Sequence, residues 1–434
     1  MKRIDLTIVA QSPLAIGQRK PGGSVSEALD YIPGTIIRGA IAKQILQRAD
    51  SEPEPGDEFS RLFLENKAAI FCNGYSTICE AATSTGEKTY QDMPGPVRVL
   101  PSTALSNKTH SGFTSADDHK KTGVFDSLID GYCAREHDHF YTPNDINGEL
   151  VDTFSAYYSK EGDQYHQHEI SKRLLTRVGI NRRRAVAQDE ILYSVEVIEE
   201  TPGKKPPRQA SKATDESNPT NTKFKSTIII PESDDLAASL LTFLQTHCTH
   251  LRIGGSASRG LGKVQVTASA LQDHTVTDLD QRVKAFNQLL KSRWRFWDAL
   301  GSRPDPTENK LFFSLTFQAD AILADRWRRT VVITPDMLAP SLGIEAKQIE
   351  MHMASSSHEY RSGWNAAWGL KKDTALVTKK GSVMLYSVPK QLKENVLSKL
   401  ATLEQTGIGE RCCEGYGQLR ICDEFHKVMR ETPV

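Results

Sequence analysis

The chain has 434 residues, more than one ordinary hydrophobic core holds, so we expect two domains. Hydrophobic residues make up 38% and charged residues 25%, a composition typical of soluble globular proteins. Lys plus Arg and Asp plus Glu are equal at 54 each, so the net charge is zero. This balance argues against a protein that coats nucleic acid indiscriminately, although it permits a local basic surface.

The N-terminus and the cysteines favour a cytoplasmic location. Met1–Leu6 alternates polar and apolar residues like a first strand and lacks the apolar stretch of a signal peptide. No apolar run approaches the ~18 residues that span a bilayer, so we expect no membrane contact. The seven cysteines are odd in number and widely scattered, which favours reduced thiols.

The opening segment predicts a strand, a turn and a helix. Ile4–Val9 has the pattern of a strand, and Pro33-Gly34 makes a turn after which Thr35 can cap a helix. Arg38 and Gly39 follow early in that helix, so its N-terminus and the guanidinium could face an anion. An ordinary capped helix with a solvated arginine is the alternative.

Two stretches have little regular periodicity. Residues 83–147 are rich in loops, and residues 201–225 contain four prolines that interrupt a predicted strand pair, Ile191–Val197 and Ser226–Ile230. In and near the first stretch lies a set of possible zinc ligands: Cys72, Cys79, Cys133, His137 and His139. Their spacing is not that of a zinc knuckle, so we expect neither a metal nor a cofactor.

The densest basic segment runs from Lys172 to Arg184. Because Glu169 and Asp189 lie outside it, the run contains no compensating acid. Asn181 falls at a strand or turn that could present it, with the arginines, to phosphates. A solvated charged face is the plain alternative.

A repeated unit of helix, Gly-rich loop and strand is the strongest organisational signal. The first copy has a helix over Asp234–His247 and a loop over Gly254–Gly262, and the second has a helix from about Lys390 to Glu404 and a loop over Gly407–Gly417. The loops differ by one residue between Gly255 and Gly260 on the one hand and Gly409 and Gly415 on the other. Two copies imply two related domains.

Glycines in such loops permit positive φ angles and let backbone amides approach a phosphate closely. A tight turn that only links helix to strand is the alternative. A Walker-type phosphate loop is excluded, because Ala257 and Val264 stand where that motif needs Gly and Ser or Thr.

The domain boundary follows from the start of the second copy. Leu311–Phe317 predicts an opening strand like Ile4–Val9, and before it come a helix candidate from Leu279 to Trp294 and the Pro-rich Arg303–Pro306. We therefore place the first domain at 1–272, with insertions at about 83–147 and 201–225, a connecting helix and linker at 273–308, and the second domain at 309–434.

Catalytic signatures are missing from the sequence. It contains neither His-Glu-x-x-His nor Gly-x-Ser-x-Gly, and Cys412-Cys413 beside Arg411 is more plausibly incidental than a reactive thiolate. Aromatic side chains can stack on bases but more often belong to cores or interfaces, so none of the five tryptophans is assigned to stacking. These are Trp294, Trp297, Trp327, Trp364 and Trp368.

Taken together, these segments resemble the RAMP superfamily of CRISPR effector subunits. The matching stretches are Ser12-Pro-Leu-x-x-Gly17, Tyr31-Ile-Pro-Gly-x-x-x-Arg-Gly-Ala40, Gly179-Ile-Asn-Arg182, Leu192-Tyr193-x-x-Glu196 and the Gly254–Gly262 loop. The ending over Gly407–Gly417 is similar to the type III-D RAMP subunit of the Csx-ten kind, a group-five protein. The resemblance implies an α+β fold of two ferredoxin-like, RRM-type βαββαβ domains with large loop insertions.

The resemblance also implies a function. It indicates a non-catalytic RNA-binding subunit of a type III CRISPR effector complex in antiviral defence, holding the 5′ handle of the guide (cr)RNA. Its expected partners are the large polymerase-like subunit, the backbone RAMP subunits and, indirectly, target RNA. Because Glu414 stands where the first loop has Arg259, we expect the second domain to contact protein more than RNA.

The residues that we expect to bind RNA are Gly34, Arg38, Gly39, Arg177, Asn181, Arg182, Arg183, Arg184, Gly254, Gly255, Ser256, Arg259, Gly260, Gly262, Lys263, Gly409, Arg411, Gly415 and Gly417.

Three other functions stay open. An endoribonuclease that trims the guide precursor would need a general base, typically histidine, and no histidine lies in the Gly-rich loops or beside Arg38. A backbone RAMP that cleaves target RNA would use a loop aspartate, for which Asp117, Asp118 and Asp126 are candidates. The last alternative is a protein that uses its Gly-rich loops only as turns and binds no RNA.

Overall fold

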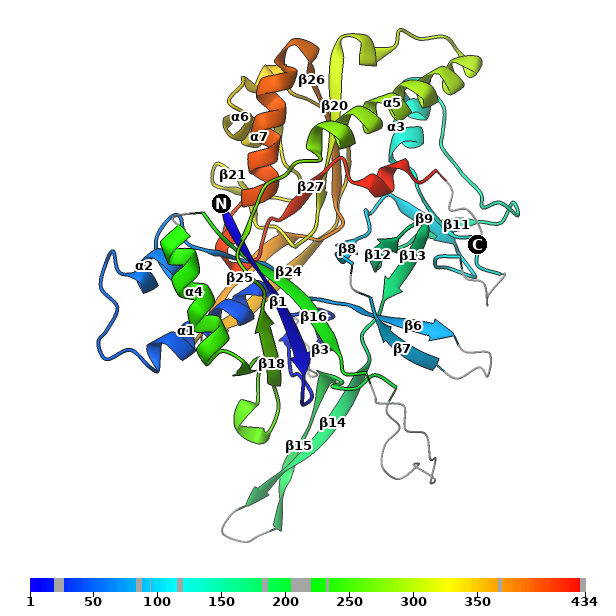
Figure 1. The fold of residues 1–434 in the computed structure, drawn as a ribbon. Coiled ribbons are helices and arrows are strands. Elements are labelled where there is room, and N and C mark those ends of the chain that lie inside the picture. Colours follow the sequence, from blue (N-terminus) through cyan, green and yellow to red (C-terminus); the bar gives the residue numbers. More distant parts are fainter. Residues whose placement is uncertain are drawn as a thin grey trace.

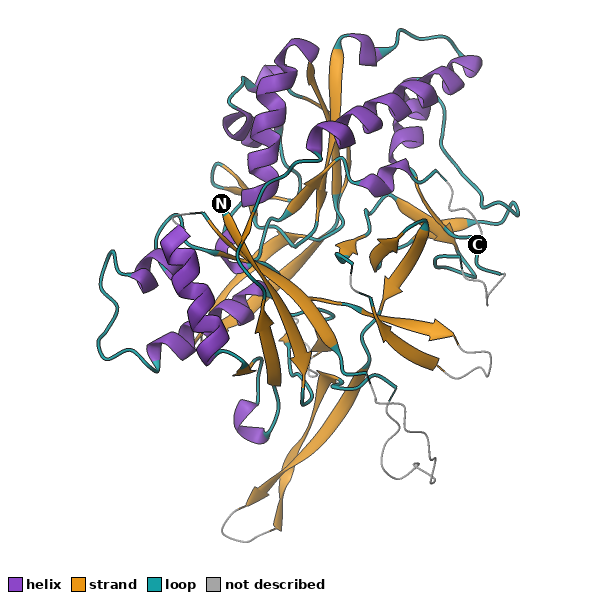
Figure 2. Cartoon of the chain, in the orientation of Figure 1, coloured by secondary structure: helices purple, strands orange, loops and turns teal. Residues whose placement is uncertain are grey.

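The computed structural model is a mixed α/β protein with several antiparallel sheets (Figures 1 and 2). It describes residues 1–18, 27–82, 88–93, 95–114, 120–181, 186–203, 220–231, 234–365 and 369–429. In the described part of the chain, no helix is both long enough and apolar enough to cross a membrane.

The first half is built on a sheet whose central order is β18-β1-β16-β4. In chain order the strands are β1 (Lys2–Ala10), β4 (Ile70–Phe71), β16 (Lys223–Ile230) and β18 (Lys263–Ala268). Helix α1 (Gly34–Leu46) follows the first of them and α4 (Asp234–His247) the third. The short strands β5 (Tyr75–Ser76), β17 (His250–Arg252) and β19 (Gln272–Asp273) extend this sheet.

Alternation along β1 decides which face of this sheet is buried. Ile4, Leu6 and Ile8 are buried with the apolar faces of α1 and α4, whereas the residues between them are only partly buried. The helix expected over Asp234–His247 is confirmed with the same bounds.

The second half repeats this succession of elements. Its strands are β20 (Lys310–Phe317), β23 (Glu350–Ser355), β26 (Val383–Pro389) and β27 (Leu419–Ile421), in the sheet order β23-β26-β20-β27. Helix α6 (Pro335–Leu342) follows the first strand and α7 (Lys393–Thr406) the third. The expected opening strand and the expected helix before the second loop are therefore confirmed.

Both faces of β20 are covered. Phe313 stacks on Tyr386 on one face, while Phe312 contacts Tyr132 of α3 (Leu128–Glu136) on the other. Helix α5 (Leu279–Trp297), expected as a connector, packs on α3 and β20. It contributes to the hydrophobic core of the second half, which we call the second core. The loop-rich stretch of the sequence thus supplies a helix to the second core (Figure 1).

Parts of that stretch also form strands: β7, β8, β9 and β10 lie within it and pair with β6, β11, β12 and β13, which lie outside it, in two small sheets with the orders β7-β6-β13-β12-β8 and β10-β9-β11. Strands this short leave too few residues to show a period. They are β6 (Ile78–Ala82), β7 (Lys88–Asp92), β8 (Arg98–Val99), β9 (Ala104–Asn107), β10 (Val124–Asp126), β11 (Val151–Thr153), β12 (Tyr157–Glu161) and β13 (Gln164–His168).

Four β-hairpins lie in a row, which we call the hairpin row. β15 contacts β3, β2 contacts β24, and β25 contacts both β21 and β22. The β14–β15 hairpin projects from the body of the molecule (Figure 2). The members are β14 (Lys172–Asn181) with β15 (Val186–Ile198), β2 (Gly17–Gln18) with β3 (Glu27–Ala28), β24 (His358–Asn365) with β25 (Leu370–Thr378), and β21 (Leu323–Asp325) with β22 (Arg328–Thr330).

The expected pairing of Ile191–Val197 with Ser226–Ile230 is wrong. β15 pairs with β14, because β16 already has β1 on one edge and β4 and β5 on the other. A strand that is saturated on both edges cannot accept another partner.

The two halves meet around Asp320, which follows β20. Its buried carboxylate accepts hydrogen bonds from the Arg361 side chain at 2.9 Å and from the Lys380 backbone N–H at 3.0 Å. From the first half, the Tyr31 hydroxyl approaches the same carboxylate at 3.4 Å. These donors compensate a charge that would be costly to bury alone.

The second Gly-rich loop packs directly on the start of α1. A Cβ on Gly34 would lie 1.8 Å from the Phe71 carbonyl oxygen and 2.9 Å from that of Glu414, and a Cβ on Gly415 would lie 3.2 Å from the Cα of Gly34. Thr35 is not the helix cap, because α1 begins at Gly34, whose N–H donates to Asn73 Oδ1 at 2.9 Å.

We predict opposite effects for two glycines of α1. Gly34→Ala should lower the free energy of unfolding by about 1–3 kcal/mol, because the new methyl group overlaps backbone of both halves. Gly39→Ala is the matched control: a Cβ there meets nothing within 4 Å, so helix propensity should raise stability by up to about 1 kcal/mol. Urea unfolding of the full chain measures both, and equal stabilities would contradict this packing.

A buried histidine ties the C-terminal segment to two other elements. His426 Nδ1 lies 3.2 Å from the Asp126 carboxylate of β10, and its Nε2 lies 2.9 Å from Thr316 Oγ1 of β20. Although burial opposes the charged imidazole, the Asp126 and Asp423 carboxylates raise the pKa of His426 above its ordinary value.

This pair should make stability depend on pH. Because the folded pKa of His426 is raised, its contribution is fully present below about pH 6.5 and is lost as pH rises through the folded pKa. We therefore expect the gap in thermal midpoint between the wild type and His426→Gln to be largest near pH 6 and to narrow toward pH 9. His247→Gln, at an exposed position, is the control. A gap independent of pH would rule out a protonated His426.

Candidate nucleic-acid interface

The two Gly-rich loops have the same backbone. Each contains one 3₁₀ turn, Ala257–Arg259 in the first and Cys412–Glu414 in the second. Four positive φ angles recur in order: Gly254 78° and Gly409 99°, Ser256 56° and Arg411 59°, Gly260 86° and Gly415 92°, Gly262 81° and Gly417 70°. The expected difference in length is therefore wrong, because Gly254 rather than Gly255 is the counterpart of Gly409.

Most of the first loop's glycines serve contacts within the chain. The N–H groups of Gly255 and Gly262 donate to the carbonyl oxygens of Ala15 (2.8 Å) and Pro13 (2.9 Å), so these two amides are already used. A Cβ on Gly254 would lie 2.6 Å from the Ala15 carbonyl oxygen, and one on Gly262 would lie 2.2 Å from a backbone oxygen. Gly260 differs, because a Cβ there meets nothing within 4 Å.

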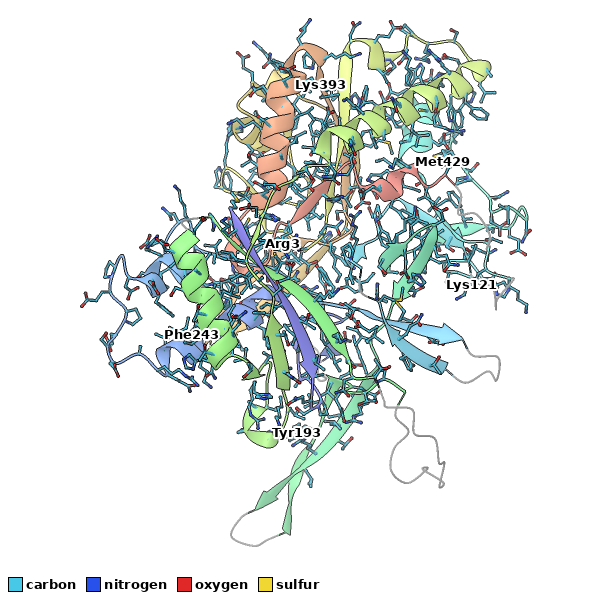
Figure 3. The ribbon with its side chains drawn as sticks, viewed as in Figure 1. Arg3, Lys121, Tyr193, Phe243, Lys393 and Met429 are labelled. Carbon is cyan, nitrogen blue, oxygen red and sulfur yellow. The ribbon has the colours of Figure 1, made fainter. Side chains whose placement is uncertain are left out.

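The side chains of the first loop gather with those of the projecting hairpin. The Arg259 guanidinium carbon lies 5.5 Å from the ring centroid of Tyr193 on β15, and Arg259 donates to the Tyr193 hydroxyl. Arg177 of β14 donates to the Arg259 carbonyl oxygen at 3.4 Å. Figure 3 labels Tyr193 at this point, where the hairpin leaves the body and the loop comes close.

Two more cations border this group. Arg252 donates to the carbonyl oxygens of Ala257 and Leu261, both at 3.2 Å, and faces Lys263 directly across the β17–β18 pair. Like charges directly opposite each other are unfavourable unless an anion lies near. We call Arg177, Tyr193, Arg252, Arg259 and Lys263 the hairpin-base cluster; no described carboxylate forms an ion pair with its four cations.

The other basic residues of the Lys172–Arg184 run either have partners within the chain or lie outside the described residues. Arg173 pairs with Glu200 at 3.1 Å, so the run is free of acids in sequence but not in space. Lys172 Nζ donates to the Ala28 carbonyl oxygen at 2.6 Å. Arg182, Arg183 and Arg184 lie outside the described residues, and the backbone of Asn181 ends β14 while its side chain is likewise outside them.

The expected residues of α1 do not join the hairpin-base cluster. Gly34 is covered by the second loop. Arg38 donates to the Phe63 carbonyl oxygen, and its guanidinium carbon lies 5.7 Å from the centroid of the Phe63 ring. The guanidinium is therefore engaged by α2 (Glu58–Phe63). Gly39 is exposed on the helix surface.

The second loop binds its own acid. Arg411 and Lys372 donate to Glu414 at 2.5 Å and 2.9 Å. Burial opposes the charged form, but these hydrogen bonds and charges lower the pKa of Glu414 to about 2. A Cβ on Gly409 or Gly417 would lie 2.5 Å or 2.0 Å from a carbonyl oxygen, so these glycines also serve internal packing. This loop is an internal contact between the two halves.

Sequence reasoning missed two members of the hairpin-base cluster. Tyr193 and Arg252 were not among the expected RNA-binding residues, although Tyr193 belongs to the Leu192-Tyr193-x-x-Glu196 stretch that carries the family resemblance. That stretch was the available signal, but the contact of Tyr193 with Arg259 is tertiary.

Other chemical candidates lie apart from this surface. Cys79 is buried 3.2 Å from His168, Cys133 lies in the second core, and His137 contacts Asp298 at 3.1 Å. In the described segments no three His, Cys, Asp or Glu side chains come together in a way that could hold a metal ion. Burial raises the pKa of Cys412 to about 11, which disfavours a reactive thiolate.

The candidate catalytic aspartates and the tryptophans do not join the hairpin-base cluster where their side chains are described. Asp126 is buried against His426, and Asp117 and Asp118 lie outside the described residues. Trp294 and Trp297 are buried in the second core, while Trp327 is 87% exposed. The side chains of Trp364 and Trp368 are outside the described part.

Several solved structures resemble the chain, with low sequence identity and low TM-scores. A type III-B Cmr-beta complex bound to cognate target RNA matches with 10% identity and a TM-score of 0.38, covering 90% of this chain and 88% of that one. The same complex with AMPPnP gives 9% identity, a TM-score of 0.37, and coverage of 90% and 87%. Oligomeric Cmr4 from Pyrococcus furiosus gives 12% identity, a TM-score of 0.26, and coverage of 62% and 98%.

No curated protein matches the chain. The family model of the RAMP superfamily matches residues 7–265. The match runs from β1 into β18 and so takes in the whole hairpin-base cluster. Since it spans more than half of the sequence, the chain belongs to the RAMP superfamily.

Proposed function

We propose that this protein is a cytoplasmic, non-catalytic RNA-binding subunit of a type III CRISPR effector complex, and that the hairpin-base cluster binds the guide RNA. The observation that carries the proposal is this cluster: four cations without a described carboxylate partner, placed between a Gly-rich loop and a projecting hairpin. Membership of the RAMP superfamily supports it.

The charge distribution is consistent with this role. With a net charge of zero, the chain has no overall attraction to nucleic acid, so binding must come from a local surface. Guanidinium groups bind phosphate oxygens through charge-assisted hydrogen bonds, and such contacts position RNA without reading its sequence. The cluster also includes Tyr193, whose ring holds Arg259 in place.

The finer assignment is a group-five RAMP of the III-D, Csx-ten kind with two ferredoxin-like domains. It is supported by the two halves, each of which runs strand, helix, strand, strand, helix, strand with the fourth, first, third and second strands side by side. We propose that the first domain holds the 5′ handle of the guide RNA and that other surfaces contact the large subunit and the backbone RAMP subunits. Because the second Gly-rich loop packs against the start of α1, we assign RNA binding to the first loop.

Replacing Arg177 and Arg259 together by Ala should weaken guide-RNA binding and flatten its salt dependence. The slope of log affinity against log salt should fall by about one unit for each phosphate that no longer has a cationic partner. Filter binding of the full chain at several salt concentrations measures this. Arg295→Ala, an exposed arginine of α5, is the matched control and should leave the slope unchanged. Equal slopes for the double variant and the wild type would refute RNA binding at the cluster.

We also propose that the isolated protein does not cut RNA. No described histidine belongs to the hairpin-base cluster, and Asp126 is engaged with His426 rather than exposed to a substrate. A repeat-containing transcript incubated with and without divalent metal should stay intact on a gel. Site-specific cleavage that disappears on changing one histidine would indicate a guide-processing nuclease. Cleavage abolished by Asp117→Ala or Asp118→Ala would indicate a target-cleaving backbone RAMP.

A further inference from the structure

The tip of the β21–β22 hairpin carries an exposed cationic aromatic group. Asp325 pairs with Arg328, so Arg326 and Trp327 alone form the turn. Trp327 is 87% exposed, and Arg326, Arg328 and Arg329 are exposed around it. We call Arg326–Arg329 the tryptophan tip. The turn follows β21, which Figure 1 labels in the second half.

The turn conformation is one that an arginine rarely adopts. Arg326 has a φ of 57°, in the left-handed region that favours glycine or asparagine. Glycine is also the preferred residue where a two-residue hairpin turn needs a positive φ. An arginine that occupies such a position against its backbone preference suggests a role other than stability.

Part of the positive charge of the tip has no ion-pair partner among the described residues. Arg329 pairs with Glu410 at 2.6 Å, but neither Arg326 nor Arg328 forms an ion pair with a described residue. Likewise, no aromatic ring or cation of the described residues stacks on Trp327. The indole therefore presents a face to solvent between two available cations.

Such a combination fits a single-stranded nucleic acid. Bases stack on an exposed aromatic ring, and flanking arginines bind the adjacent phosphates. A protein partner would also use a tryptophan, but protein hot spots are buried in an apolar surround, whereas the neighbours of Trp327 within the tip are all cationic.

The tip lies on the same structure as the hairpin-base cluster. It ends one hairpin of the row, which contacts β25, and the row continues through β24, β2 and β3 to β15, the strand that carries Tyr193. The two cationic surfaces thus belong to opposite ends of one continuous row of hairpins.

We propose that the tryptophan tip is a second RNA contact, in which Trp327 stacks on an unpaired base and Arg326 and Arg328 bind the phosphates beside it. This contact rests on the proposed function, because it extends the path of an RNA held at the hairpin-base cluster.

The test compares Trp327→Ala, Trp327→Phe and Arg326→Gly in the full chain. The probes are a single-stranded RNA of mixed sequence and a matched oligonucleotide whose bases are replaced by abasic sites. Trp327→Ala should lower affinity for the intact RNA about tenfold and change affinity for the abasic one little, because stacking needs a base. Trp327→Phe should retain most of the affinity. Phe140→Ala, which removes another exposed aromatic ring, is the control.

Arg326→Gly separates binding from folding. Glycine relieves the positive φ, so the thermal midpoint should hold or rise while RNA affinity falls and the salt slope drops by about one unit. A purely structural role for Arg326 would leave RNA affinity unchanged.

The outcomes distinguish this contact from the proposed function. Unchanged RNA affinity of Trp327→Ala overturns the contact, and the proposed function still stands if the Arg177 and Arg259 variant binds weakly. A wild type that binds no RNA overturns both. If Trp327→Ala keeps its RNA affinity but no longer copurifies with a protein subunit, the tip is a protein contact and the proposal is wrong.

Discussion

The buried carboxylate of Asp320 is the point on which the arrangement of the two halves depends. The carboxylate accepts hydrogen bonds from Arg361 of the β24–β25 hairpin, from the backbone N–H of Lys380 and from the hydroxyl of Tyr31. The backbone carbonyl oxygen of Asp320 accepts a further hydrogen bond from the N–H of Gly417. One residue thus connects the first half, the hairpin row and the second Gly-rich loop. Because a buried ion is costly without full compensation, these groups must assemble together.

The two Gly-rich loops show how one backbone serves two purposes. Both place glycines where a Cβ would overlap a carbonyl oxygen, so the loop shape is a packing requirement in each half. The difference lies in position 259 and its counterpart 414. Arg259 turns to the projecting hairpin, whereas Glu414 is bound by Arg411 and Lys372 as its loop packs on Gly34. Charge and neighbouring contacts, not loop geometry, distinguish the first loop from the second, which packs inside the molecule.

Part of the candidate site could be predicted from the sequence. Arg177, Arg259 and Lys263 were expected from the basic run and the first loop, and they lie in one cluster. Arg38 and Gly34 were expected to bind RNA because they belong to the motif at the start of α1. Arg38 instead binds the Phe63 carbonyl oxygen, and Gly34 is covered by the second loop. A sequence shows which groups can bind an anion, but it does not show which of them another part of the chain already covers.

Periodicity determined the elements that are long and amphipathic. The helix over Asp234–His247 and the opening strand Leu311–Phe317 follow directly from the spacing of their apolar residues. The recurrence of helix, Gly-rich loop and strand likewise indicated that the second half repeats the order of elements of the first. Only the tertiary structure decided the partner of β15, the place of α3 in the second core and the covering of Gly34. Each of these depends on contacts between residues far apart in the chain, which local spacing does not encode.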